Sequence, residues 1–189
     1  MSRKKQSTAA VGKTSAPQVL LRAPKLDDEA EFLAAVRRSR ILHGRYAHPP
    51  ATAEKFRANV LRLQGPSHLG FLVIDSASEA IAGAINLNEI VRGPAQSAYL
   101  GYYALEPFAG RGYMSAGLAK VIGIAFGRLN LHRLEANIQP ENDRSLALVR
   151  QFGFQCEGYS PRYLKLGGQW RDHERWALLK EDWKRDRRR

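Results

Sequence analysis

Two glycines placed two residues apart stand directly before a run with the pattern of a helix. Gly110 and Gly112 lie in EPFAGRGYMSAGLAKVIGIAF, residues 106–126, and the first turns of the expected helix contain no Asp or Glu. A helix begins with backbone N–H groups that have no acceptor within the helix, and its dipole is positive at that end. Because no acidic side chain occupies these groups, they suit an external anion, most often phosphate. The spacing therefore predicts a phosphate-binding loop.

Two other chemistries fit the chain less well. Gly110-Arg111-Gly112 supplies half of the dinucleotide motif G-x-G-x-x-G, but Ser115 holds the third glycine position. Strands of antiparallel appearance precede the loop, whereas a Rossmann fold opens with it. The chain has no Walker A motif, and its five histidines are scattered without cysteines or carboxylates at ligand spacing. We therefore expect no metal site and keep a Rossmann site only as an alternative.

Length and composition indicate one domain in a reducing compartment. The chain has 189 residues, of which 44% are hydrophobic, which is enough for one well-packed core. A single cysteine, Cys156, excludes an internal disulfide framework and is expected to be a small buried side chain. No apolar stretch approaches membrane length, and no secretory leader pattern opens the chain. A cytoplasmic protein is expected.

The net charge of +12 is concentrated at the two ends. Residues 1–18 contain four bases and no acid, and residues 184–189 carry a net charge of +4, so two thirds of the excess lies there. We expect a disordered basic tail at 1–17, one folded domain at 18–183 and a second basic tail at 184–189. Such tails are attracted to RNA phosphates without reading sequence, or are solvated ends.

The apolar periodicity predicts alternating groups of strands and helices. Expected strands cover 19–22, 68–75, 80–90, 97–105 and 132–139, with a final hairpin that turns at Gly167-Gly168. Expected helices run from an N-cap at Asp27 to about Arg40, from a cap at Thr52, over 112–128, and from Asn142 to an end at Gly153. This order predicts an α+β (mixed α/β) domain.

Three separated motifs, in this order, resemble the GNAT acyltransferases. They are LGYYALEPFAGRGYMSAGL (100–118), LHRLEANIQPENDRSLALVRQFGFQCEGY (131–159) and GGQWRDHERWALL (167–179), and GAINLNEI (83–90) fits the same pattern. The resemblance is strongest to the branch of the ribosomal-protein-alanine N-acetyltransferases. It implies a central, mostly antiparallel sheet with flanking helices, in which the parallel strands 97–105 and 132–139 splay apart. Acetyl-CoA would lie in the V-shaped opening between them.

The resemblance also implies which residues bind acetyl-CoA. Backbone N–H groups after the first splayed strand would hold the pyrophosphate, and the backbone at the end of that strand would pair with the pantetheine amides. Asn142 would hold the pantetheine or pyrophosphate arm, and Ser145 would lie near the thioester sulfur. The chain departs from the family motif at Ala109 and Met114, although neither change removes a backbone donor. The cofactor set is Tyr103, Ala104, Leu105, Gly110, Arg111, Gly112, Tyr113, Met114, Ser115, Asn142 and Ser145.

The same resemblance assigns the catalytic roles. Glu135 matches the general base, which commonly acts through water, and its alternative role is a salt bridge with Arg133. Asn142 and Ser145 could alternatively do no more than cap a helix. Relatives use a tyrosine as general acid where this chain has Val149, so Ser145 or another tyrosine such as Tyr113 would assist.

Two further segments are candidates for the border of the acceptor site. Trp170, Asp172 and His173 repeat the family's Trp-x-Asp-His, and we favour packing of the tryptophan with an Asp–His contact over a role at the acceptor mouth. The segment 43–64, which includes Arg45, Tyr46 and His48, is expected to form the other wall of the acceptor site.

The function implied is transfer of acetyl from acetyl-CoA to a primary amine by direct attack on the thioester. The acceptor expected is the N-terminal α-amine of a protein of the ribosomal type, with the basic tails in weak contact with RNA or the ribosome. Small amines such as antibiotics, polyamines or amino acids are the alternative acceptors. A non-catalytic adaptor that binds acyl-CoA or RNA on the same scaffold is the alternative outside the enzymes. No membrane partner is expected.

Overall fold

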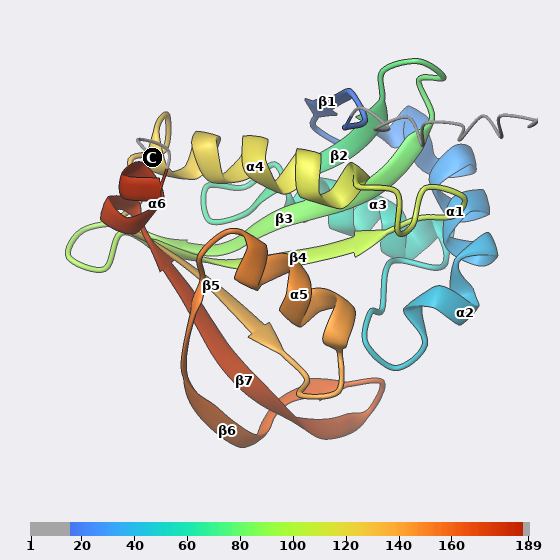
Figure 1. The fold of residues 1–189 in the computed structure, drawn as a ribbon. Coiled ribbons are helices and arrows are strands. Elements are labelled where there is room, and N and C mark those ends of the chain that lie inside the picture. The colour runs from blue at the N-terminus through green and yellow to red at the C-terminus, as the bar shows by residue number, and fades with distance from the viewer. Residues whose placement is uncertain (1–15, 187–189) are drawn as a thin grey trace, which may run out of the picture.

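The computed structural model describes the backbone of residues 16–186 and the side chains of residues 16–183. Its centre is a seven-stranded sheet in the order β1-β2-β3-β4-β5-β7-β6, and helices lie on both faces (Figure 1). The strands are β1 (Val19–Arg22), β2 (Leu69–Asp75), β3 (Ile81–Val91), β4 (Ser97–Ala104), β5 (Arg133–Ile138), β6 (Gln155–Leu166) and β7 (Gln169–Leu179). A short 3-10 turn, η1 (Leu26–Asp28), precedes the helices α1 (Glu29–Arg38), α2 (Arg40–His43), α3 (Ala53–Arg62), α4 (Tyr113–Phe126), α5 (Asp143–Gln151) and α6 (Lys180–Asp186).

One pair of neighbouring strands is parallel, and it comes apart. β4 and β5 pair only where Ser97–Tyr99 lies beside Arg133–Glu135, and the other neighbouring strands pair antiparallel. Beyond Glu135 the two strands diverge toward their carboxyl ends, which Figure 1 shows as a gap between β4 and β5. This confirms the predicted mixed sheet with a splayed parallel pair. The Rossmann alternative is wrong, because that fold needs a doubly wound parallel sheet.

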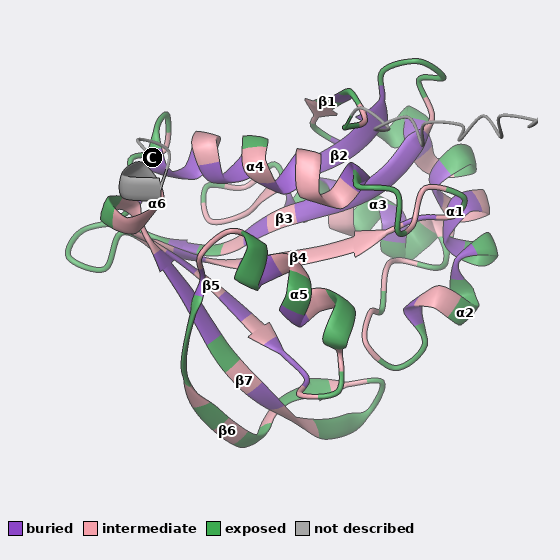
Figure 2. Cartoon of the chain, in the orientation of Figure 1, coloured by how far each residue is buried: buried purple, intermediate pink, exposed green. Residues whose placement is uncertain are grey.

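The two faces of the sheet have separate hydrophobic cores. One core packs α4 and α5 on the sheet, and the other packs α1 and α3 on the opposite face. Buried positions accordingly follow the sheet and the inward sides of the helices (Figure 2). α4 comes close to the sheet at Gly117, where an added Cβ would lie 2.8 Å from the side chain of Val73. A larger residue there would push away the helix whose first turn faces the loop at 110–112.

Most of the predicted helix ends are found, with one exception. Thr52 caps α3 by accepting from the N–H of Lys55, and Gly153 follows α5 in the left-handed conformation with φ 80°. Asp27, predicted as the first N-cap, lies instead inside η1, and α1 begins at Glu29. The neighbouring carboxylate, Asp28, accepts two hydrogen bonds from the Arg22 guanidinium (2.6 and 2.8 Å). That ion pair ties the start of the helical layer to β1.

Two further expectations change at the chain ends and at the cysteine. Cys156 is exposed, because it lies on β6, which forms the edge of the sheet and which no helix covers, so its predicted burial is wrong. α6 continues to Asp186, three residues past the predicted domain end. The remainder of both predicted basic tails, residues 1–15 and 187–189, lies outside the described residues.

Candidate active site

The loop after β4 ends in the geometry that an anion site needs. Gly110 and Gly112 have φ of 73° and 84°, and Gly112 is the N-cap of α4. The first hydrogen bond of the helix runs from Ala116 N–H to Gly112 O (3.0 Å). The N–H groups of 113–115 therefore come before any intrahelical bond, and the first turn contains no acid. The N–H of Arg111 instead donates to Phe108 O (3.3 Å), which corrects its predicted place among the phosphate donors.

The side chains of this turn point away from the loop. A Cβ at Gly83 on β3 would overlap the sulfur of Met114, so the missing side chain at Gly83 makes room for this methionine. The hydroxyl of Tyr113 donates to Asp75 Oδ1 (3.1 Å) at the end of β2. Tyr113 is thereby engaged elsewhere, which argues against its predicted role as general acid. The departure from the family motif at Met114 leaves the backbone N–H groups in place.

The edge of β4 that faces the opening offers fewer groups than predicted. Leu105 donates its N–H to Ala82 O (2.9 Å), and its carbonyl accepts from Phe108 (2.9 Å). Because alternate residues of a strand bond to the same neighbour, the backbone groups of Tyr103 also face β3, and those of Tyr102 and Ala104 face the opening. The backbone of Tyr103 and Leu105 is thus turned away from the opening, against the prediction, and of the three predicted residues only Ala104 faces it.

The start of α5 places a serine opposite a tyrosine of β4. Asn142 caps the helix, since its Oδ1 accepts from Ser145 N–H (3.3 Å), and this leaves its amide NH₂ group for a ligand. The hydroxyls of Ser145 and Tyr102 lie 2.6 Å apart. This pair joins the two arms of the opening. Val149 is fully buried in the core and offers no proton. Tyr102 was not among the site residues predicted from the sequence. The available signal was that neighbouring residues of a strand point in opposite directions, so Tyr102 and Tyr103 must differ in orientation.

Burial changes the proton chemistry of Tyr102. Loss of water around the phenol raises the pKa of Tyr102 to about 12, against the smaller opposing effect of the hydrogen bond with Ser145. The hydroxyl therefore stays protonated at neutral pH. It can donate a hydrogen bond to an atom that gains negative charge in the opening.

Glu135 takes part in the ion pair that was its alternative role. Its Oε1 accepts from Arg133 Nε (2.8 Å), and Arg133 also bonds Glu157 on β6. Glu135 lies opposite Tyr99 in the last residue pair of the β4–β5 ladder. Because Leu134 and the other even-numbered residues of β5 are buried under α5, alternation directs Glu135 to the other face. The contact with Arg133 uses Oε1 and, among the described residues, leaves Oε2 without a hydrogen bond.

The next residue on that face has an unsatisfied amide. Asn137 lies beyond the last β4–β5 pair, where the strands have separated, and its buried Oδ1 has no hydrogen-bond partner within residues 16–183. A buried polar atom without a partner costs about 1–3 kcal/mol. A ligand N–H or a water at this point of the opening would satisfy the atom.

A loop from the helical layer spans the mouth of the opening. His43, at the end of α2, bonds Ala104 O through Nε2 (2.8 Å). A few residues later Tyr46 donates to Glu141 O (3.0 Å), and Arg45 pairs with the carboxylate of Glu141 (3.2 Å). The segment 43–46, part of the predicted acceptor wall, therefore contacts the ends of both arms.

The Trp-x-Asp-His segment does not behave as predicted. The side chain of Trp170 is 59% exposed and so does not lock the hairpin by packing. Asp172 accepts from the Tyr159 hydroxyl and from Arg162 N–H (2.7 Å), both on β6, rather than from His173. His173 is buried, its Nδ1 lies 3.0 Å from Arg171 O, and burial lowers the pKa of the imidazole. The hairpin is held by Asp172 and not by the tryptophan.

Within the part of the chain that the structure describes, no group of three or more His, Cys, Asp or Glu side chains could hold a metal ion. No helix in the same part is long and apolar enough to cross a membrane. The chemistry of the opening is that of backbone donors, hydroxyl groups and one carboxylate.

A splayed parallel pair, followed by a glycine loop and an acid-free helix start, defines the fold of acyl-CoA-dependent N-acyltransferases. Residues 18–155 match the acetyltransferase (GNAT) domain, so the chain belongs to the GNAT family of acetyl-CoA-dependent N-acetyltransferases. It is 38% identical over 113 residues to the [ribosomal protein uS5]-alanine N-acetyltransferase of Escherichia coli strain K12. That match covers 60% of this chain and 58% of the relative's length.

Solved structures of the same fold include complexes with CoA. Mycobacterium smegmatis RimJ in complex with CoA-disulfide superimposes with a TM-score of 0.80 at 26% identity, covering 87% of this chain and 83% of the other. Spermidine N-acetyltransferase of Vibrio cholerae, in complex with CoA and spermine, reaches 0.75 at 21% identity over 88% and 98% of the two chains. The second likeness concerns the fold alone. Both neighbours are complexes with CoA, whose pyrophosphate is an anion of the kind that the glycine spacing predicts.

Proposed function

We propose that this protein acetylates the N-terminal α-amine of a protein of the ribosomal type. The observation that carries the proposal is the 38% identity to an enzyme named for the alanine of ribosomal protein uS5. The chemistry of the acceptor agrees. An α-amine has a pKa of about 8, so about a tenth of it is neutral at pH 7, whereas a lysine with a pKa of about 10.4 is almost wholly charged.

The proposed reaction is direct attack of the neutral amine on the thioester carbon. The attacking nitrogen gives up a proton, the C–S bond breaks, and CoA leaves as a thiolate. The N–H groups of 113–115 hold the pyrophosphate, and the backbone of Tyr102 and Ala104 orients the pantetheine. A backbone N–H on the β4 side meets the oxygen of the thioester as it gains charge.

Glu135 removes the proton in this scheme. Its Oε2 binds a water that links it to the acceptor nitrogen, while Arg133 holds Oε1 in position (2.8 Å). Asn137 Oδ1 accepts an N–H of the same amine and keeps its lone pair directed at the thioester. These roles use the face of β5 opposite α5.

Tyr102 and Ser145 stabilise the departing sulfur in this scheme. A thiol has a pKa of about 8.5, whereas the pKa of Tyr102 is about 12. Full transfer of the phenol proton to the thiolate would thus be unfavourable. Tyr102 therefore donates a hydrogen bond and keeps its proton, and Ser145 orients the phenol. The cytoplasm, which holds acetyl-CoA, is the compartment that such a reaction needs.

Thiol release from acetyl-CoA tests the proposal. The acceptors are peptides with a free N-terminal Ala or Ser, the same peptides with blocked N-termini, an aminoglycoside and spermidine. Turnover is expected only with free N-termini and should fall about 100-fold in Glu135→Gln. Glu157→Gln, which also loses a contact with Arg133 but lies on the sheet edge, is the matched control.

Each other result contradicts a part of the proposal. Turnover of spermidine or the aminoglycoside alone would assign the protein to the small-amine acetyltransferases. An absence of turnover with every acceptor, together with a rise of the melting temperature on adding acetyl-CoA, would favour the non-catalytic adaptor. Equal losses in Glu135→Gln and Glu157→Gln would indicate that the carboxylate only positions Arg133.

A further inference from the structure

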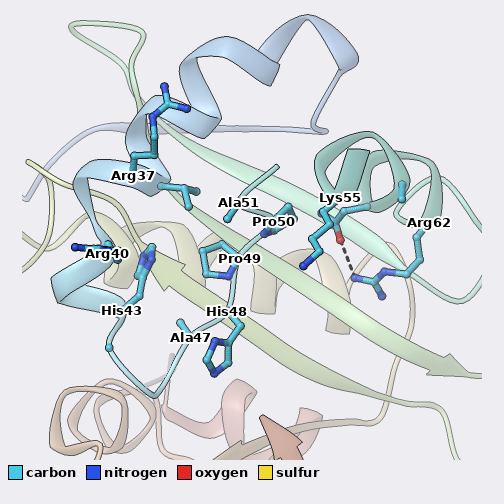
Figure 3. A pocket seen from close by; sticks show the side chains of 14 residues that line it. Arg37, Arg40, His43, Ala47, His48, Pro49, Pro50, Ala51, Lys55 and Arg62 are labelled. Carbon is cyan, nitrogen blue, oxygen red and sulfur yellow. Dashed lines mark hydrogen bonds between the residues drawn. The ribbon is translucent and has the colours of Figure 1, made fainter. Parts of the chain in front are cut away.

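A groove of about 700 Å³ lies between α1, α2, the loop 44–51 and α3 (Figure 3). The sheet face below it is the one that carries Glu135, since α1 and α3 cover that face. Its lining includes six basic side chains and no carboxylate. They are Arg37, Arg40, His43, His48, Lys55 and Arg62.

The cations of this groove are not neutralised by the chain. Among the described residues, no carboxylate lies within salt-bridge distance of Arg37, Arg40, Lys55 or Arg62. Within the described part of the chain, Arg62 bonds the neutral amides of Asn59 and Asn88 (3.1 Å each), and Figure 3 shows Arg62 at the groove wall. Of the acids on α1 and α3, Glu29 pairs with Arg57 (2.6 Å) and Glu31 accepts from the N–H of Ile81 (2.8 Å). Glu54 on α3 is exposed and lies outside the groove lining.

One end of the groove meets the opening. His43 belongs to the lining, and its Nε2 bonds the carbonyl of Ala104, the last residue of β4. The other end is reached along α2 and α1 at Arg40 and Arg37. Six residues at a helical rise of 1.5 Å separate His43 from Arg37, or about 9 Å. An extended peptide covers that distance in about three residues.

We infer that the groove binds an acidic stretch of the acceptor, at about the third to sixth residues behind the acetylated N-terminus. The inference rests on the proposed function and names the class of N-terminus that the site takes. Its carboxylates would lie among Arg37, Arg40 and Lys55 while the α-amine reaches the opening beside Ala104. Spermidine, which is cationic over its whole length, would be repelled by the same side chains.

Three peptides that differ only in charge test the inference. Each has a free N-terminal Ala followed by Gly, then three Glu, three Gln or three Lys, and a neutral remainder. At low salt the Glu peptide should exceed the Lys peptide about 10-fold in kcat/KM, because three attractive charge pairs with the groove replace three repulsive ones. The difference should shrink in 0.5 M NaCl.

Charge reversal in the groove should invert this preference. Arg40→Glu and Lys55→Glu each put an acid in the first turn of a helix, where it is tolerated, so both variants should fold. The double variant should prefer the Lys peptide. Arg38→Glu makes the same charge change on α1 at an exposed residue outside the groove lining, and it should keep the preference for Glu.

The outcomes separate this inference from the proposed function. If no free N-terminus is acetylated, the proposed function fails first. If the three peptides turn over equally, or if Arg38→Glu acts like the double variant, only the assignment of the groove is overturned. Loss of binding to a short single-stranded RNA in the double variant, with no change in peptide preference, would assign the groove to RNA instead.

Discussion

Replacing Tyr102 by Phe removes the hydroxyl that lies 2.6 Å from Ser145 Oγ and leaves the ring in its core. At pH 7 the loss of one such hydrogen bond should lower the free energy of unfolding by about 1 kcal/mol. For a chain of this size that corresponds to about 2–4 °C in Tm. The variant should therefore remain folded, and its other properties can be measured.

The effect of Tyr102→Phe on the free energy of unfolding should change sign in alkaline solution. Burial raises the pKa of Tyr102 from about 10 to about 12 in the folded protein, so the folded state holds the proton more tightly than the unfolded chain does. This contribution is fully present below pH 10 and is lost as the pH rises from 10 toward 12. At about 1.4 kcal/mol per pH unit the wild type loses roughly 3 kcal/mol over that range, and Tyr102→Phe does not. The two stability curves should cross near pH 11.

Urea unfolding of both proteins between pH 7 and 11.5 measures the crossing. A difference that stays constant with pH would refute the argument that the phenol is held neutral by burial.

The same variant tests catalysis. Both Tyr102→Phe and Ser145→Ala should lower kcat about 10-fold or more with little change in the KM for acetyl-CoA, and the double variant should lose little more than either single variant. Additive losses would show that the two hydroxyls act separately.

Three further variants address the loop, the unsatisfied amide and the buried histidine. Gly112→Ala forces a side chain into φ 84° and should weaken acetyl-CoA binding about 10-fold by calorimetry, whereas Gly123→Ala, inside α4 with open space at its Cβ, should bind normally and gain about 0.5–1 kcal/mol. Asn137→Ala removes a buried oxygen that has no partner within residues 16–183, so the free energy of unfolding should not fall and should rise by up to about 1–3 kcal/mol, whereas kcat/KM for a free N-terminus should fall; a loss of stability would contradict this. Burial lowers the pKa of His173, so the unfolded chain takes up a proton first and stability falls as the pH drops through about 6.5. His173→Asn should flatten that fall in urea titrations, and an unchanged acid slope would count against it.

The parts of the fold that depend on local pattern could be predicted from the sequence. Thr52 and Asn142 cap helices because their short polar side chains reach the exposed N–H groups, whatever the rest of the chain does. The phosphate loop was equally local, since Gly110, Gly112 and the acid-free turn are neighbours in the chain. Their conformation needs few tertiary contacts.

The parts of the fold and of the site that depend on contacts between distant segments could not be predicted from the sequence. The sequence contains Tyr102 and Ser145 in separate motifs, and only the pairing of β4 with β5 brings their hydroxyls together. Leu105 was assigned to pantetheine because motif position does not reveal that its N–H is bonded to Ala82. The burial of Cys156 was misjudged because the nearby apolar residue Phe154 does not indicate that β6 is the sheet edge. The groove draws its basic side chains from three helices and a loop, so no short segment contains its pattern.

The helical layer is one uninterrupted segment, residues 26–62, inserted between the neighbouring strands β1 and β2 and packed in its own core. The proposed acetyl-CoA site lies instead at the end of β4 and the start of α4, beside the other core. Evolution, or an engineer, could thus exchange this segment for another and change the acceptor while the donor site stays as it is. The junction that such a graft must reproduce includes the packing of α1 and α3 on the sheet and several polar contacts. Ser39 Oγ accepts from the N–H of Glu106 (2.8 Å), and His43 bonds Ala104 O. Asp28 pairs with Arg22 on β1, and Tyr46 donates to Glu141 O.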